Sequence, residues 1–119
     1  MSNLNTVDDC LFCKISSGAI PVDVVIETEN AIAFRDIDPK APTHVLVIPK
    51  AHFADVTELS ASNPNLAGEL LALAAEVAKQ EGLDKGYRIV TNNGEDAGQS
   101  VAHVHFHVLG GRSLSWPPG

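Results

Sequence analysis

Three histidines alternate with three apolar residues in one stretch near the end of the chain, His103-Val104-His105-Phe106-His107-Val108-Leu109. Successive side chains of a β-strand point to opposite faces of a sheet, so this stretch predicts a strand with its three histidines on one face. The apolar residues between them would anchor the other face in a core. A solvated edge strand that is rich in histidine is the plainer interpretation. Three aligned imidazoles favour a catalytic or metal-binding site instead, because histidine acts as nucleophile, acid–base group and metal ligand.

Four other segments predict strands, because they are short, rich in β-branched and apolar residues, and bounded by turn formers. They are residues 24–27, 31–35, 44–48 and 87–91. A turn at residues 28–30 joins the first two, and the loop 36–42 contains two prolines that would interrupt a ladder. Short connections of the hairpin type dominate, which favours antiparallel pairing.

One long helix is predicted after Asn63-Pro64, which resembles an N-cap followed by proline at the first helical position. Leucine, alanine and valine recur at helical spacing from Leu66 to Val77, and Gly82 is a suitable C-terminal cap. A short helix over Leu11 to Ile15 would be capped by Asp8 or Asp9 and end at Gly18, and a helical turn is expected at 54–59. The predicted fold class is therefore α+β, with about five antiparallel strands, one long helix and one short helix.

The length of 119 residues fits a single domain spanning 1–119, with residues 1–9 expected to be flexible. The net charge of −7 and pI near 5.0 argue against binding nucleic acid, which needs clustered basic side chains. The N-terminal residues do not form a signal-peptide pattern, and the chain has no apolar run long enough to cross a bilayer, so we expect no membrane partner and a cytoplasmic location.

The polar loop 92–100 precedes the histidine stretch and carries two glycines, amides and a hydroxyl. Glycine lets backbone N–H groups approach an anion, so such a loop can cradle a phosphate, although an ordinary hairpin connection has the same composition. His105 is the middle imidazole. A neutral imidazole can attack phosphorus and then leave, provided that an acceptor holds its other nitrogen. The pattern suits phosphoryl or nucleotidyl transfer.

The histidine stretch resembles the signature of the histidine triad (HIT) superfamily, and within it the Hint group of nucleoside phosphoramidate hydrolases. The similarity runs from Phe12 to Gly119. The segments that carry it are Ile20-Pro21, Phe34-Arg35-Asp36-Ile37, Ala41-Pro42-Thr43-His44, Val47-Ile48-Pro49-Lys50, Leu83-Asp84-Lys85-Gly86-Tyr87-Arg88, Gly98-Gln99-Ser100, Gly110-Gly111-Arg112 and Trp116-Pro117-Pro118-Gly119. The resemblance implies a HIT-like fold that forms a two-fold dimer, and hydrolysis of purine nucleoside 5′-phosphoramidates, which are conjugates of AMP or GMP.

The resemblance also implies roles for individual residues. His105 would form a nucleotidyl-histidine intermediate, and His44 would support the triad. His107 would hold the α-phosphate together with Asn92, Gly98, Gln99 and Ser100. Asp36 would accept from the ribose hydroxyls, since a carboxylate can accept from two vicinal hydroxyls. An apolar slot for the purine would be formed by Phe12, Ile15, Ile20, Phe34 and Ile37, although an ordinary core position explains these residues too.

Cys10 and Cys13 have the spacing of a zinc half-site, and two free buried cysteines or a redox pair are the alternatives. Certain HIT proteins with such a pair bind a structural zinc, which implies His52 and His103 as the other ligands. As a zinc ligand His103 could not donate to a substrate, so its two possible roles compete. No organic cofactor is expected. By the same resemblance the C-terminal tail 112–119, with Trp116, would reach the active site of the partner subunit.

Two other classes of function remain open. A catalytic zinc could be held by His103, His105 and His107, but the first and third lie about 13 Å apart on a straight strand at about 3.3 Å per residue, which counts against it. A non-catalytic, nucleotide-binding or scaffolding dimer is the other alternative.

Overall fold

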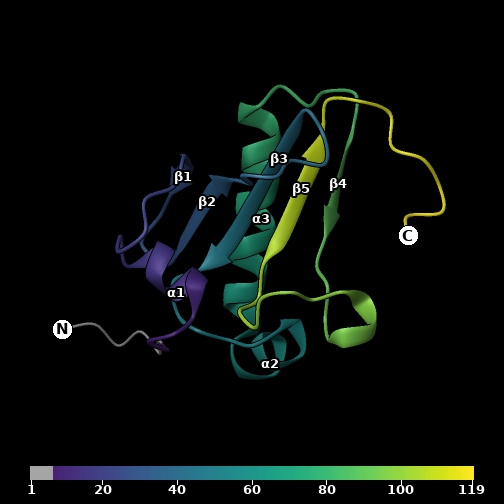
Figure 1. Ribbon diagram of the computed structural model, residues 1–119. Coiled ribbons are helices and arrows are strands. Elements are labelled where there is room, and N and C mark those ends of the chain that lie inside the picture. Colours follow the sequence, from purple (N-terminus) through teal and green to yellow (C-terminus); the bar gives the residue numbers. More distant parts are fainter. Residues whose placement is uncertain (1–6) are drawn as a thin grey trace.

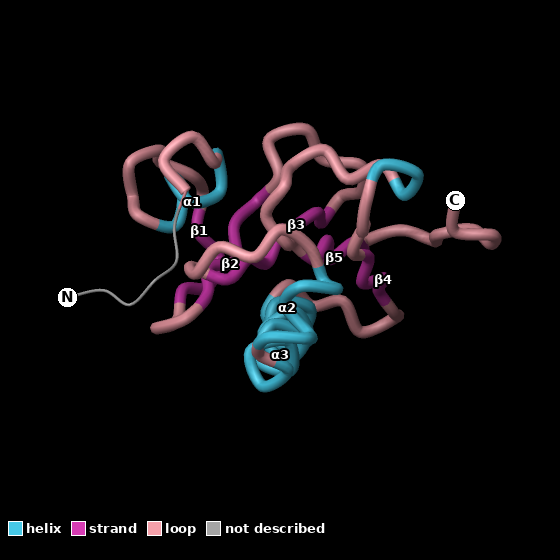
Figure 2. The backbone as a smooth tube through the Cα atoms, turned by 90° about the horizontal axis from the view of Figure 1, so that it is seen from below, coloured by secondary structure: helices cyan, strands magenta, loops and turns pink. Residues whose placement is uncertain are grey.

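The computed structural model describes residues 7–119, which form one antiparallel sheet with helices on both of its faces (Figures 1 and 2). The elements are α1 (Leu11–Ser16), β1 (Val24–Glu27), β2 (Ala31–Arg35), β3 (Thr43–Pro49), α2 (Val56–Ser62), α3 (Pro64–Gln80), β4 (Tyr87–Val90), a 3₁₀ turn (Glu95–Ala97) and β5 (Phe106–Gly110). The strands follow the order β1-β2-β3-β5-β4. The predicted α+β class with five antiparallel strands is confirmed.

Helix α3 covers one face of the sheet, and its predicted apolar stripe is buried there. Leu70, Ala74 and Val77 are fully buried and pack with Val45 and Val47, which are the odd-numbered core positions of β3. Asn63 caps the helix as predicted, because its side chain accepts a hydrogen bond from the Leu66 N–H at 3.1 Å.

The even-numbered side chains of β3 point to the opposite face, which α1 covers in part (Figure 2). Phe12 and Ile15 of α1 pack there against Phe34, Leu46 and Ile48. The alternation of β-strand side chains therefore gives the sheet two separate apolar layers.

Three predictions about the elements need correction. The expected helical turn is a complete helix, α2, capped by Asp55, so the described chain has two short helices. The N-cap of α1 is Cys10 and not Asp8 or Asp9, because the Cys10 Sγ accepts from the Cys13 N–H at 3.4 Å. Strand β5 begins only at Phe106, so His103 and His105 lie in the irregular segment before it.

Two further predictions concern the ends of the chain. The expected flexibility of residues 1–9 falls mostly on residues 1–6, which lie outside the described part. The tail after β5 runs away from the sheet on the β4 side (Figure 1), where the Arg88 guanidinium donates to the Ser115 carbonyl at 2.9 Å. Trp116 on this tail is 80% exposed in the single chain.

Candidate functional site

A cavity of about 340 Å³ opens on the sheet face that carries α1. This is the size of a pocket for a small organic ligand. Its apolar lining includes all five residues predicted for the purine slot: Phe12, Ile15, Ile20, Phe34 and Ile37. Its polar lining includes four other predicted residues: Asp36, Ser100, His105 and His107. The structure therefore places most of the predicted site around one space.

His105 is buried on the wall of this cavity, and a backbone contact determines which of its nitrogens carries the proton. Its Nδ1 lies 2.8 Å from the carbonyl oxygen of His103. A carbonyl can only accept, so Nδ1–H donates and Nε2 carries the lone pair. The ring is thus in the tautomer that a nucleophilic imidazole needs.

His107 is the next imidazole along the wall, with its ring centroid 5.1 Å from that of His105. The Lys40 N–H donates to His44 Nδ1 at 3.0 Å, so His44 carries its proton on Nε2. That Nε2–H donates to His107 Nδ1 at 2.9 Å, which leaves the proton of His107 on its Nε2. Burial lowers the pKa of His107 to about 4, and burial also lowers that of His44. His107 is therefore a neutral hydrogen-bond donor near pH 7.

Asp36 follows β2 and places a carboxylate at the edge of the cavity. One oxygen accepts from the Asp38 N–H at 2.8 Å, and the other lies 3.5 Å from His44 Nε2. The side chain is 21% exposed, so it can still accept from a ligand. Ile37, the next residue, is 96% exposed, so it lies at the rim and not in a buried slot.

The glycine-bearing loop, which is predicted to cradle a phosphate, is held by several hydrogen bonds of its own. Both amide N–H groups of Gln99 are used, because its Nε2 donates to the carbonyls of Ala54 and Val101 at 2.7 and 3.0 Å. The backbone N–H groups of Gly98 and Gln99 donate to carbonyls within the loop. Gln99 and Gly98 therefore hold the loop together, and of the loop residues predicted to bind phosphate only Ser100 lines the cavity of this described chain.

Two more predicted nucleotide contacts lie elsewhere in the described chain. Asn92 follows β4 and is half-buried, but it does not line the cavity. Trp116 is also absent from the lining, and its predicted contact with the active site of a partner subunit stays a prediction.

A second cluster brings together Cys10, Cys13, His52 and His103. The Nδ1 of His103 lies 3.4 Å from the Cys10 Sγ, 3.5 Å from the Cys13 Sγ and 3.2 Å from His52 Nδ1. The Cys13 Sγ is 3.4 Å from His52 Nδ1. These are the four residues predicted as metal ligands, and they come from segments as far as 93 residues apart.

The donor set of this cluster fits a tetrahedral zinc ion. At Zn–S and Zn–N distances of about 2.3 and 2.0–2.1 Å, tetrahedral angles place two nitrogen ligands about 3.3 Å apart and a sulfur and a nitrogen about 3.5 Å apart, close to the separations of the same pairs here. The Nε2 of His103 donates to the Pro49 carbonyl at 2.9 Å, so its Nδ1 offers one lone pair to three neighbours. A shared cation explains that convergence better than hydrogen bonds do, and the buried carbonyl contact is the usual support of a metal-bound histidine.

His103 therefore belongs to the cysteine cluster and not to the cavity. It is fully buried, and burial lowers its pKa to about 4. The alternative of one catalytic ion held by His103, His105 and His107 is wrong for the described chain. The second group that could hold a metal consists of Asp36, His44 and His107, and the hydrogen bond between the two histidines already accounts for their proximity.

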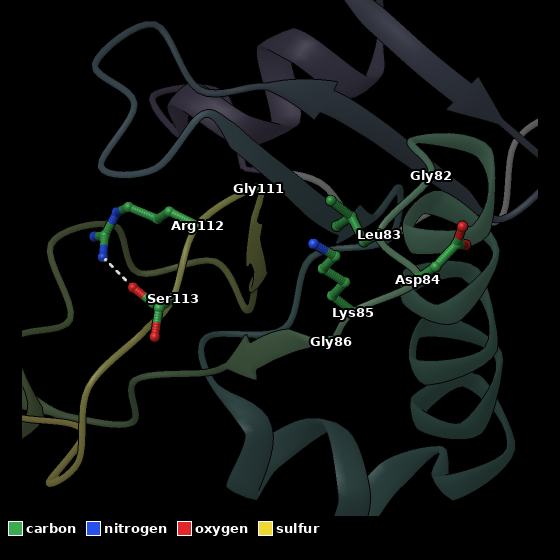
Figure 3. A pocket seen from close by; sticks show the side chains of 8 residues that line it. All are labelled: Gly82, Leu83, Asp84, Lys85, Gly86, Gly111, Arg112 and Ser113. Carbon is green, nitrogen blue, oxygen red and sulfur yellow. Dashed lines mark hydrogen bonds between the residues drawn. The ribbon is translucent and has the colours of Figure 1, made fainter.

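A larger cavity, of about 650 Å³, lies at one end of the sheet, where the turn after α3 meets the residues that follow β5 (Figure 3). Lys85 and Arg112 are its basic residues, and it shares no lining residue with the histidine cavity. The described lining contains neither histidine nor cysteine, so we take the smaller cavity as the candidate functional site.

Comparison with known proteins agrees with this arrangement. The HIT domain family model matches residues 17–114. The chain belongs to the HIT domain family. An uncharacterized HIT-like protein of Synechococcus elongatus is 50% identical over 112 residues, which is 94% of this chain and 98% of that protein. The 14 kDa zinc-binding protein of Zea mays is 48% identical over 120 residues, covering 98% of this chain and 94% of the relative.

The fold is shared with solved HIT structures. A HIT family hydrolase from Legionella pneumophila superposes with a TM-score of 0.90 at 49% identity, covering 93% of this chain and all of the other. Among the helices within residues 7–119, none combines the length and the hydropathy that a membrane-spanning segment requires.

Some site features of this HIT protein are invisible in sequence patterns. The carbonyls of His103 and Pro49 each fix the tautomer of an imidazole, and main-chain oxygens leave no mark in a sequence. Leu46 lines the cavity too, and its alternation with His44 along β3 is the signal that could have found it.

Proposed function

We propose that this HIT protein hydrolyses nucleoside 5′-phosphoramidates through a covalent intermediate on His105. The supporting observation is the hydrogen bond from His105 Nδ1 to the His103 carbonyl, which leaves the Nε2 lone pair available beside a nucleotide-sized cavity. Membership in a family with solved hydrolases supports the same conclusion.

The cavity can hold a nucleotide by contacts of three kinds. The apolar lining, which includes Phe12 and Phe34, would bind the purine. The Asp36 carboxylate would accept from the ribose hydroxyls. His107 Nε2–H and the Ser100 hydroxyl would donate to oxygens of the α-phosphate, where charge-assisted hydrogen bonds are strong.

The reaction would proceed by two displacements at phosphorus. In the first, His105 Nε2 forms a bond to the α-phosphorus, the P–N bond breaks, and the amine leaves with a proton taken from solvent. In the second, a water oxygen attacks the phosphorus, the P–N bond to His105 breaks, and the water gives up a proton. The products are a nucleoside 5′-monophosphate and a free amine, and His105 regains its neutral form.

The test compares the parent with His105→Asn. An asparagine amide can still donate to the His103 carbonyl, but it offers no nucleophilic lone pair. We expect hydrolysis of adenosine 5′-monophosphoramidate to fall by at least about 1,000-fold, while AMP binding changes little. Intact-mass spectrometry of the parent during turnover should show a transient adduct of one AMP residue, and the variant should not. A variant that retained near-parent turnover would exclude the covalent route.

We further propose that Cys10, Cys13, His52 and His103 hold one structural zinc ion. The separations of their ligand atoms and the name of the Zea mays relative support this. Zinc would tie the segment before α1 to the end of β3. Elemental analysis of the purified protein should give one zinc per chain, and Cys13→Ser should lower that ratio sharply. A metal-free parent would argue for two free cysteines.

We also propose a homodimer. Strand β4 is an edge strand whose Tyr87 is 42% exposed, and the C-terminal tail runs on the same side of the molecule (Figure 1). Sedimentation velocity should give twice the chain mass, and a monomer at micromolar concentration would exclude this assembly.

A further inference from the structure

Helix α1 lies between the cysteine cluster and the histidine cavity and contributes to both. Cys10 caps its first turn and Cys13 follows within it, and both thiols belong to the cluster. Phe12 and Ile15 line the cavity. A helix of six residues is too short to be stable by itself, so tertiary contacts at these positions determine where it lies.

Two contacts join the cluster to the predicted nucleophile. The His103 side chain lies in the cluster, while its carbonyl oxygen accepts from His105 Nδ1 at 2.8 Å. The Phe12 ring packs edge-on against both imidazoles, at centroid distances of 5.9 Å from His103 and 5.1 Å from His105. A shift of α1 or of His103 would therefore reach His105 directly.

The rest of this region is anchored independently of the cluster. The Val104 N–H donates to the Phe53 carbonyl at 2.7 Å, and Val104 is buried in the core beneath α3. Phe12 and Ile15 pack against apolar residues of β2 and β3, and these contacts would still hold α1 near the sheet, though with more freedom. Loss of the cluster should therefore loosen α1 and His103 without unfolding the sheet.

We propose that Cys10, Cys13, His52 and His103, tied together by a zinc ion, are positioning residues for the nucleotide pocket as well as a structural tie. By fixing α1 and the His103 carbonyl, they hold the Phe12 wall of the pocket and the tautomer of His105. This inference rests on the proposed nucleotide site. Its consequence is linkage: zinc must tighten nucleotide binding, and the nucleotide must tighten zinc binding by the same factor.

The experiment measures both sides of this linkage on the full chain. AMP dissociation constants are determined by calorimetry for zinc-loaded protein, for protein stripped by a chelator and for the same sample after zinc is restored. Zinc dissociation constants are determined by competition with a chromophoric chelator, with and without saturating AMP. We expect zinc removal to weaken AMP binding at least about fivefold, reversibly, and AMP to tighten zinc binding by a matching factor.

Matched variants separate the cluster from the helix that carries it. Cys13→Ser should reproduce the stripped state without any chelator. Lys14→Ala changes the exposed neighbour on the same helix and should bind zinc and AMP as the parent does. Phe12→Ala should keep its zinc but lose AMP affinity, because it removes the pocket wall and not the ligands.

Imidazole ¹H–¹⁵N spectra give a readout that needs no nucleotide. The Nδ1–H signal of His105 should be sharp with zinc and broadened or shifted without it. AMP dissociation constants that agree within about twofold with and without zinc would overturn the inference. Global unfolding on zinc removal would overturn it too, because the cluster would then be needed for the whole fold. If zinc-loaded protein binds no AMP, the proposed function fails, and the His105 signal still decides this inference.

Discussion

His44 offers the sharpest test of the proposed site, because it orients His107 without lining the cavity. His44 receives a hydrogen bond from the Lys40 N–H and donates one to His107 Nδ1 at 2.9 Å. Substituting His44→Leu removes this donor at a position that is only 4% exposed. His107 Nδ1 then loses its hydrogen-bond partner, and the proton of the ring is free to move from Nε2 to Nδ1.

The expected loss of activity follows from this change in the tautomer of His107. In the altered tautomer His107 presents a lone pair to the phosphate where the parent presents an N–H group. A hydrogen bond to a charged group contributes about 1.5–3 kcal/mol, which corresponds to about a 10- to 150-fold fall in kcat/KM. The unsatisfied nitrogen should also lower the free energy of unfolding by about 1–3 kcal/mol.

The matched control is His44→Gln, since its amide nitrogen can stand near the Nε2 position and still donate to His107. We expect it to recover most of the activity lost in His44→Leu. Release of AMP from adenosine 5′-monophosphoramidate, followed by chromatography, gives kcat/KM, and imidazole NMR gives the tautomer of His107. The reasoning is refuted if the Leu variant keeps the parent's kcat/KM, or if His107 remains protonated on Nε2 in that variant.

Three further predictions follow from single contacts. Asp36→Asn should weaken AMP binding by about 1–2 kcal/mol and leave binding of 2′,3′-dideoxy-AMP almost unchanged, as calorimetry can show; equal losses for both ligands would contradict the ribose contact. His107, with its pKa lowered to about 4 by burial, stays neutral while the unfolded chain gains protons below about pH 6.5. The free energy of unfolding should therefore fall as the pH drops from 6.5 to 4. Urea titrations of His107→Gln should show a fall that is smaller by about 1–2 kcal/mol, allowing for solvent screening; an unchanged dependence of the free energy of unfolding on pH would be inconsistent with a neutral His107. Gly111→Ala should destabilise the fold by about 1–3 kcal/mol in the same assay, because Gly111 has φ of +90° and an added Cβ would lie 2.9 Å from the Pro42 Cβ; a neutral result would mean that this turn relaxes freely.

Local patterns in the sequence determined the elements of this protein. Short runs of β-branched and apolar residues between turn formers predicted strands β1 to β4 within a residue or two, and Asn63-Pro64 and Gly82 marked the ends of α3. The alternation of histidine with apolar residues separated Val104, Phe106 and Val108, which are buried beneath α3, from His105 and His107 on the cavity side. These features depend on side-chain type and spacing, which a sequence states directly.

Tertiary structure alone decided which partner each polar group meets. The alternation predicted three histidines on one face of a single strand, yet strand β5 starts at Phe106 and His103 lies in the cluster with Cys10 and Cys13. The Gln99 amide was predicted to bind phosphate, but its two N–H groups donate to the carbonyls of Ala54 and Val101. The tautomers depend on carbonyls and imidazoles brought together from distant segments. Such contacts arise when the chain closes on itself, so no local pattern of residues encodes them.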